Sequence, residues 1–379
     1  MVKLLSKAQP AQASQALGEE GSVAVASQWQ LMWWKFRKNH MAIIGLVVAI
    51  LYYLLAIFAE FGAPKSVDFY DAEYVYAPPQ QIQFFNEGRF EPFVYGLKYE
   101  RDPLSLRQLW EVDEETRIPL GIFVKGEPYK LLGVFSSDIH LFGTVEPDAP
   151  FFLLGADRNG RDLLSRIIFS ARISLTVGLV GVFASLVIGV LVGGVSGLFG
   201  GLIDVVIQRL IEIVNSVPNL PLMMAFAAIV PPGTPAVQVY LLVTLILAMF
   251  SWTGMARVVR GRFLALREED FILAARLDGV RTRRLITRHM LPSFLSHIVA
   301  SITIAIPYMI LSETGLSFLG LGLRPPTVSW GVLLRDANRI SVLKDFPWLL
   351  WPAPAVIIFV VAMNFVGNGL RDAADPYAT

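Results

Sequence analysis

Six long stretches of this chain carry almost no charge, and they constrain its fold more than any other feature. Each is long enough to cross a hydrocarbon core, which takes about 20 helical residues. One such stretch could be a helix buried inside a soluble domain, but six argue against that interpretation. The sequence therefore predicts an all-α polytopic membrane protein with six transmembrane helices. The predicted spans are residues 41–59, residues 173–203, two helices within residues 213–256 joined by a turn at 231–235, residues 289–312 and residues 346–370.

The composition agrees with a membrane protein and argues against several other classes. Only 17% of the 379 residues are charged, whereas a soluble domain has about 25%. The net charge of +1 argues against a nucleic-acid partner, because binding to phosphates requires a concentrated basic surface. The absence of cysteine excludes disulfides, thiolate metal sites and a cysteine nucleophile.

Basic residues next to the first span predict its orientation. Lys35, Arg37 and Lys38 precede it, and cytoplasmic flanks carry an excess of Lys and Arg. Both termini are therefore expected in the cytoplasm, since six crossings return the chain to the same side. Residues 28–40 mix Trp with these cations, which is typical of an interfacial helix. A signal peptide is the alternative for the first span, but forty residues before it are far more than an n-region has.

Residues 61–150 differ from the rest of the chain in composition. They are rich in Tyr, Phe and Pro, and residues 118–124 and 129–135 favour short strands separated by a turn at 125–128. We expect an extracytoplasmic, strand-containing insert between the first and second helices. The predicted organisation is 1–40 as a cytoplasmic tail and interfacial helix, 41–60 as the first transmembrane helix, 61–150 as the insert, and 151–379 as a core with five transmembrane helices and a cytoplasmic loop at 257–292.

The sequence offers no motif for chemistry. Residues 155–162 come close to the pattern of a phosphate-binding loop. However, Arg161 and Asp162 stand where that loop needs a Lys and then a Ser or Thr hydroxyl. The four histidines are dispersed, and neither a His-Glu-x-x-His helix nor a Gly-x-Ser-x-Gly elbow is present. We therefore expect no catalytic residue, no metal site and no cofactor. Glycines recur through residues 173–201 and would let helices pack closely, within the chain or against a partner.

The cytoplasmic loop contains the most distinctive segment, residues 270–279 (Asp-Phe-Ile-Leu-Ala-Ala-Arg-Leu-Asp-Gly). Residues 263–277 favour a helix, in which Ala274 and Ala275 would let a partner surface approach the backbone. Gly279 permits a sharp turn or a left-handed conformation after that helix. The alternative is an ordinary basic loop held against anionic headgroups.

A second short helix is expected at residues 281–290, and Pro292 fits the start of the next span. The whole pattern resembles the coupling loop of ABC-transporter permeases, the EAA motif, where a membrane subunit binds the ATPase that drives it. By that resemblance the ATPase-coupling residues are Leu273, Ala274, Ala275, Gly279, Leu291 and Pro292. Leu273 stands where the general pattern has Glu, so no Glu-based salt bridge to the ATPase is implied.

Other stretches are similar to the second membrane subunit of oligopeptide/dipeptide-type permeases. Residues 154–166 and 171–175 resemble its "LGTD..GRD..SR…GARISL" signature. The matching signature residues are Gly155, Asp157, Gly160, Arg161 and Asp162. Residues 319–322, 325–326, 329–331 and 370–376 are similar again, so the resemblance covers residues 152–376 and the first span.

The resemblance implies the six-helix architecture of an ABC importer type I permease in the bacterial inner membrane. The implied partners are two ATP-binding subunits, a second homologous permease and an extracytoplasmic solute-binding protein. The implied substrates are peptides or similar small solutes, oligosaccharides included. The alternative function is an ATPase-independent channel or a proton-coupled carrier. Carriers usually place ionisable residues in mid-membrane, whereas the predicted spans are nearly bare of charge, with Glu313 at the outer end of the fifth.

Overall fold

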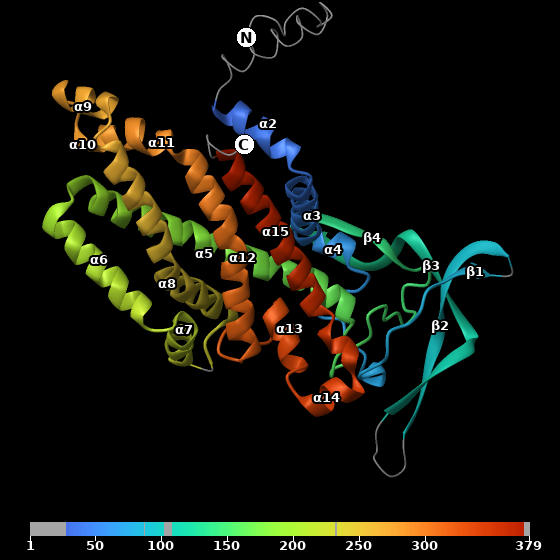
Figure 1. Cartoon of the computed structure of the whole chain (residues 1–379). Helices are drawn as coiled ribbons and strands as arrows, with labels where there is room; N and C mark the ends of the chain where they lie inside the picture. Colours follow the sequence, from blue (N-terminus) through green and yellow to red (C-terminus); the bar gives the residue numbers. More distant parts are fainter. Residues whose placement is uncertain (1–27, 87, 102–107, 232, 375–379) are drawn as a thin grey trace, which may run out of the picture.

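The computed structural model describes residues 28–86, 88–101, 108–231 and 233–374. The predicted tail before residue 28 and the last residues of the carboxyl-terminal motif lie outside the described residues. Helices make up most of the described chain, and a small sheet lies beside them (Figure 1). The predicted helical membrane protein is therefore confirmed.

Five helical stretches of the described residues are long and apolar enough to cross a membrane. They are α3 (His40–Ile57), α5 (Leu163–Phe199), α8 (Ala236–Leu266), α12 (Leu295–Phe318) and the stretch Pro347–Ala374, which contains η3 (Pro347–Leu350) and α15 (Pro352–Ala374). The third predicted span is not one straight helix. The residues predicted for it, from 213 to the turn at 231–235, hold only the end of α6 (Gly201–Ser216) and all of α7 (Asn219–Ala228), and these two helices differ in direction by 81°. The bend falls at Pro218, which has no N–H to continue a helical ladder.

Local sequence sets the ends of these helices. Asn39 caps α3, because its Oδ1 accepts a hydrogen bond from the Ala42 N–H at 3.1 Å. Asp162 caps α5 in the same way through the Ser165 N–H at 2.7 Å. Gly200, with φ +64°, ends α5 and turns the chain into α6. The second predicted span therefore begins ten residues earlier, and ends four residues earlier, than the apolar pattern indicated.

The glycines of α5 pack within the chain itself. Gly189, Gly193 and Gly197 lie one turn apart and face α8, where a Cβ on Gly193 would meet the Ala256 carbonyl oxygen at 2.3 Å. Gly178 and Gly181 face α12 in the same manner. Absent side chains thus let the backbones approach closely, as is usual where helices associate in lipid.

The insert contains an antiparallel sheet in the order β1-β2-β3-β4. Its strands are β1 (Gln83–Asn86), β2 (Arg89–Arg101), β3 (Gln108–Leu131) and β4 (Phe135–Thr144). The turn predicted at residues 125–128 is wrong, because β3 continues through it with only a shift in register between Lys125 and Tyr129. The chain reverses at residues 132–134 instead, where Leu132 and Gly133 have positive φ.

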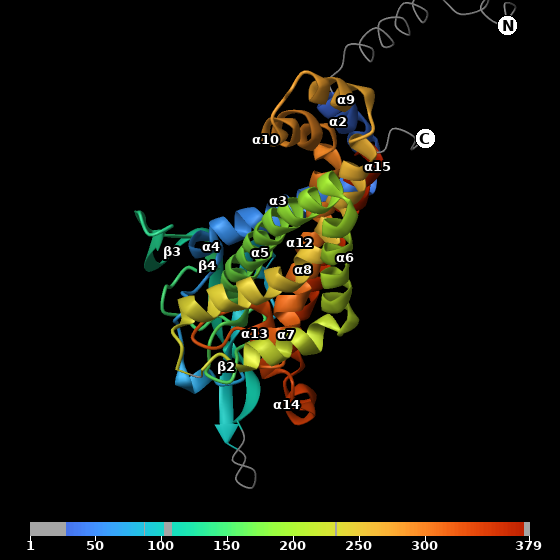
Figure 2. The same cartoon turned by 90° about the vertical axis from the view of Figure 1, so that its left-hand side faces the viewer.

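The remaining elements are short. They are α2 (Gln28–Lys38), α4 (Ala59–Gly62), η1 (Ala72–Tyr74), α9 (Asp270–Leu277), α10 (Thr282–Arg284), η2 (Leu285–Met290), α11 (Leu291–Ser293), α13 (Trp330–Asp336) and α14 (Ile340–Asp345). α9 and α10 lie at the same end of the molecule as α2 and the carboxyl end of α15 (Figures 1 and 2). α14 lies at the opposite end in both views. The helical bundle therefore has two distinct ends, and the arginine-rich loop marks one of them.

The contact between α5 and α8 gives a testable prediction. Gly193→Ala should destabilise the protein by roughly 1–3 kcal/mol, because the new methyl group collides with backbone rather than with a flexible side chain. Gly261→Ala is the matched control: Gly261 also lies in a helix, but a Cβ there meets nothing within 4 Å. The apparent midpoint of thermal unfolding in detergent should fall for the first variant only. Equal midpoints for the two variants would contradict the packing.

Candidate functional site

The arginine-rich loop at residues 257–292 is built from the end of α8, the short helices α9 and α10, and the π-helix η2. The single helix expected over residues 263–277 is in fact two helices. Glu269 adopts an extended backbone (φ −73°, ψ 142°), and its carbonyl oxygen accepts the first hydrogen bonds of α9 from Ile272 and Leu273. α9 therefore leaves the direction of α8 (Figure 1).

The loop has a small hydrophobic core of its own. Ile272 and Ala275 of α9 pack with Phe263 of α8 and with Leu285 and Met290 of η2. Phe294 and Ile298, at the start of α12, complete this core. α9 is therefore attached firmly to two of the long helices, α8 before it and α12 after it.

The end of α9 forms a Schellman motif. The Val280 N–H donates to the Ala275 carbonyl at 3.1 Å, and the Gly279 N–H donates to the Arg276 carbonyl at 3.0 Å. Gly279 has φ +72°, which is the left-handed conformation, one of the two that the sequence permits there. Val280 packs against the loop core, which is the hydrophobic contact that usually accompanies this motif.

The two alanines of the motif have different surroundings. Ala275 is buried in the loop core, so its small side chain serves close packing inside the loop. Ala274 is exposed, and so is Gly279. Leu291 packs at the edge of the core, and Pro292 is exposed in α11. Only part of the predicted set therefore faces outward.

The outward side of α9 carries large apolar side chains. Leu277 is 89% exposed, Phe271 46% and Leu273 41%. The sequence did not identify Leu277 and Phe271 as site residues, because eight residues are too few to show an amphipathic pattern. From α9 to η2 the loop also exposes Arg276, Arg281, Arg283, Arg284 and Arg288. An apolar surface with a basic surround suits a protein partner with an apolar groove and acidic edges.

The second helical segment of the loop also differs from the prediction. Residues 281–290 form one turn of α10 followed by the six-residue π-helix η2. π-helices are rare and are frequent at functional sites. Leu285 and Met290 face the loop core from this segment, so its wider winding places two large side chains against α9.

The signature residues lie at the other end of α5, in a segment that we call the clasp (residues 155–162). Its backbone joins three parts of the chain. The Asp71 N–H donates to the Gly160 carbonyl at 3.1 Å, the Tyr76 N–H to the Asp157 carbonyl at 3.0 Å, and the Trp348 indole N–H to the Ala156 carbonyl at 3.1 Å. The clasp therefore fastens the insert and the segment before α15 to the start of α5.

The side chains of the clasp hold its own shape. One carboxylate oxygen of Asp157 accepts from the N–H groups of Asn159 and Arg161, and the other forms a buried ion pair with Arg166. Gly160 has φ +71°, and a Cβ there would lie 1.7 Å from the Asp71 carbonyl oxygen. These residues therefore stabilise the conformation of the clasp.

The clasp is far from the arginine-rich loop. α5 has 37 residues and is about 55 Å long, and the two segments lie near its opposite ends.

Glu313 lies within α12 and is fully buried. One carboxylate oxygen accepts from the hydroxyls of Ser317 at 2.7 Å and Ser329 at 2.9 Å. The other is 3.4 Å from the Ser174 hydroxyl of α5. This acid therefore joins α5, α12 and the start of α13. Among the described residues, no cluster of three or more His, Asp or Glu side chains could hold a metal ion.

The cap of α9 gives a graded prediction. Gly279→Ala should destabilise the loop by about 1 kcal/mol, because an L-residue with a Cβ strains at φ +72°. Gly279→Asn should cost less, since Asn tolerates the left-handed conformation, and Gly279→Val should cost more. Limited proteolysis in detergent should cut the loop most slowly in the Asn variant, faster in the Ala variant and fastest in the Val variant. Equal rates for the three variants would show that the Schellman motif does not hold the loop.

The clasp gives a prediction about pH. Burial raises the pKa of the Asp162 carboxyl from 3.8 to about 6. Because this pKa is higher in the folded chain than in the unfolded chain, the folded state binds more protons between these values, and stability falls as the pH rises from about 4 to about 6. Asp162→Asn keeps a helix cap but cannot ionise, so its apparent thermal midpoint should fall less over that pH range. An unchanged pH profile would contradict this assignment.

Comparison with known proteins agrees with the geometry. Residues 185–378 match the family model described as "Binding-protein-dependent transport system inner membrane component", and residues 27–79 match "N-terminal TM domain of oligopeptide transport permease C". The chain is 33% identical over 355 residues to a dipeptide transport system permease protein, DppC, of Lactococcus lactis, which covers 93% of this chain and 92% of that protein. It is 30% identical over 371 residues to the oligopeptide transport system permease protein OppC of Bacillus subtilis, covering 97% and 96%.

Proposed function

This chain belongs to the family of binding-protein-dependent transport system inner membrane components, and we propose that it moves peptides through the membrane for an ATP-driven importer. It is a transport subunit and not an enzyme. The peptide substrate is proposed from the relatives, because dipeptide and oligopeptide permeases match this chain along nearly its whole length. No observation favours a channel or a carrier that works without an ATPase.

The proposed topology has six crossings in the bacterial inner membrane, with α6 and α7 together forming the bent third span. Both termini and the 257–292 loop lie in the cytoplasm, and the insert lies outside. α2 supports this orientation, since it exposes Trp29, Trp33 and Trp34 beside its basic residues. It also lies at the same end of the molecule as α9 and α10 (Figure 2). The core helices would then have the type I importer arrangement, preceded by the 1–40 and 41–60 segments and the 61–150 insert.

The proposed assembly contains this chain, a second homologous permease, two ATP-binding subunits and an extracytoplasmic solute-binding protein. The exposed side of α9 is the proposed ATPase-coupling site, with Leu273, Ala274 and Gly279 on its surface. Ala275, Leu291 and Pro292 would shape the same site from beneath. Leu277 and Phe271 extend the proposed contact beyond the motif.

The observation that carries this proposal is the attachment of α9 to two long helices through one core. A force applied to α9 by a closing ATPase would reach α8 through Phe263 and α12 through Phe294. These two rings pack edge to face, with their centroids 5.7 Å apart. Packed cores change between discrete arrangements rather than deform continuously. The helices would therefore tilt together between outward-open and inward-open states.

A substitution at the exposed apolar face tests the coupling site. Leu277→Arg should abolish copurification of the ATP-binding subunits, because it puts a charge at the centre of an apolar contact without touching the loop core. Val134→Arg is the matched control, since Val134 is 73% exposed at the β3–β4 hairpin. The measurement is affinity purification in gentle detergent with mass spectrometry of the copurifying chains, together with ATP-dependent peptide uptake.

Two outcomes of that experiment are decisive. Loss of the ATP-binding subunits and of uptake with Leu277→Arg, with both retained by Val134→Arg, supports the proposal. Full uptake by a normally inserted Leu277→Arg variant would mean that the exposed face of α9 is not the coupling site. Uptake that persists after ATP depletion in the unaltered protein would instead contradict the ATP-driven function.

A further inference from the structure

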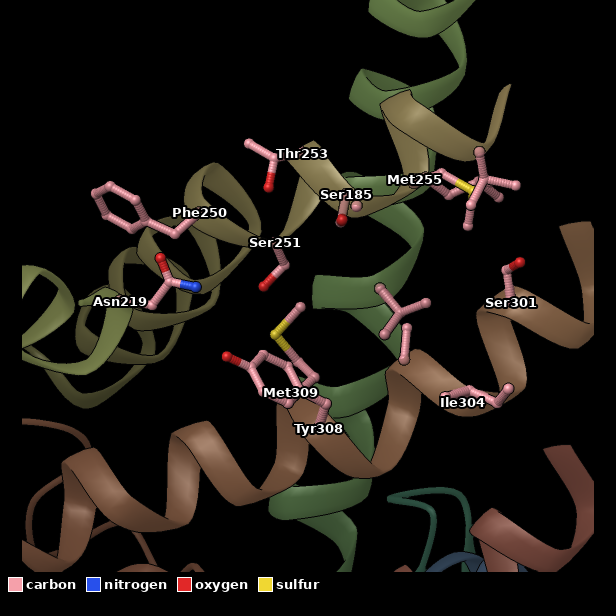
Figure 3. A pocket seen from close by; sticks show the side chains of 15 residues that line it. Ser185, Asn219, Phe250, Ser251, Thr253, Met255, Ser301, Ile304, Tyr308 and Met309 are labelled. Carbon is pink, nitrogen blue, oxygen red and sulfur yellow. The ribbon is translucent and has the colours of Figure 1, made fainter. Parts of the chain in front are cut away.

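A pocket of about 480 Å³ lies between four helices of the bundle, and this volume is within the range of small-molecule sites, about 300–1,000 Å³. Its walls come from α5, α7, α8 and α12. Figure 3 shows Asn219 of α7, Ser251 of α8 and Tyr308 of α12 around one space. These are helices that the coupling loop would move, because α8 and α12 hold α9 between them.

The lining of the pocket is uncharged and mostly apolar, with a minority of hydroxyl and amide groups. Hydroxyl and amide groups line part of it, and aliphatic and aromatic side chains line the rest. The polar lining residues are Ser185, Asn219, Ser251, Thr253, Ser301 and Tyr308. None of the fifteen lining residues, all in the described part of the chain, carries a charge. Polar side chains inside membrane-spanning segments are costly against lipid and usually face the bundle interior or a solute pathway.

Asn219 has a polar atom without a partner. Its Oδ1 is buried and accepts no hydrogen bond within the described structure. A buried amide oxygen that makes no hydrogen bond costs about 1–3 kcal/mol. Because Asn219 lines the pocket, a ligand that turns this oxygen toward the pocket and donates a hydrogen bond to it would recover that free energy. This observation is independent of the pocket's size and points to a hydrogen-bonding occupant.

The bend between α6 and α7 brings irregular backbone to the same place. Asn219 is the first residue of α7, directly after Pro218, and the two helices differ in direction by 81°. The Thr253 hydroxyl donates to the Asn215 amide oxygen at 3.1 Å and fastens the end of α6 to α8 beside the pocket. Broken helices at membrane depth are tolerated where they are buried in protein or line a solute cavity.

We propose that this pocket is a binding point on the translocation path, where uncharged hydroxyl and amide groups of this chain hydrogen-bond to the backbone of a peptide in transit. Hydroxyls and amides both donate and accept, which matches the alternating N–H and C=O groups of a peptide. Ser251 donates its own proton to the Leu247 carbonyl at 2.8 Å and keeps oxygen lone pairs for a peptide N–H. An uncharged lining leaves the peptide's side chains unselected. This inference rests on the proposed peptide transport.

The absence of cysteine allows a direct test by site-specific cross-linking. Ser251→Cys gives the chain a single thiol in the pocket, which is labelled with a benzophenone maleimide. Thr176→Cys is the matched control, because Thr176 is an exposed hydroxyl of α5 outside the pocket lining. The full complex, with its partner subunits and binding protein, is reconstituted in liposomes with ATP and tritiated alanine peptides, and then photolysed.

Tritium on this chain at position 251, several-fold above the control at position 176, is the expected result. Background tritium at position 251 in a variant that still imports the peptide would overturn the inference. A cross-link only to the second permease would also overturn it, because the pocket would then be a contact between subunits. ATP-dependent import by the unaltered complex is measured in parallel, so a failure of peptide transport itself is seen separately.

A second variant keeps the test decisive if labelling at position 251 blocks import. Asn219→Leu should slow import of the alanine peptides about three- to tenfold, the size expected for one lost hydrogen bond, and should leave the ATP-binding subunits bound. Asn364→Leu is its control, since Asn364 is an exposed amide of α15 outside the pocket. Equal import by the two variants would remove Asn219 from the path and contradict the inference.

Discussion

The close contact of α5 with α8 is the interaction on which most of this structure depends. In lipid there is little hydrophobic drive between helices, so association relies on packing and on close approach of backbones. Glycines one turn apart on α5 provide that approach, down to backbone distances that no side chain would allow. α5 is also the longest helix of the described chain, so it fixes the clasp at one end and the loop core at the other. The two ends of the protein are thereby held in one frame.

Buried polar groups in this frame serve anchoring rather than chemistry. Asp157 neutralises Arg166 and organises the clasp, while Glu313 gathers three hydroxyls between helices. Each group is costly to bury alone and acceptable once its hydrogen bonds are satisfied. Asn219 differs from these two carboxylates, because its amide oxygen is buried without a partner and its residue lines a pocket. This difference is the reason that the proposed peptide contact includes Asn219.

The proposed ATPase-coupling site and the proposed peptide-binding pocket involve the same two helices, α8 and α12. α8 and α12 meet α9 through the loop core at one end of the molecule, and they line the pocket farther along. A shift of α9 would therefore change the pocket without any additional moving part. The bent pair α6–α7 completes the pocket, and the ion pair between Asp204 of α6 and Arg260 of α8 ties it to the same unit.

The sequence by itself determined the helical membrane protein, the approximate spans and the family, because runs without charge and specific motifs are local features. It also indicated that the helix ends in a turn at Gly279, since few residues other than glycine adopt the left-handed conformation. It did not predict the 81° bend between α6 and α7, the split between α8 and α9, or the position of the β3–β4 turn. Neighbouring alanines at 274 and 275 look alike in sequence, yet one is exposed and the other is buried. Only the tertiary structure decided such outcomes, because they depend on which distant helices supply the packing surface and the hydrogen-bond partners.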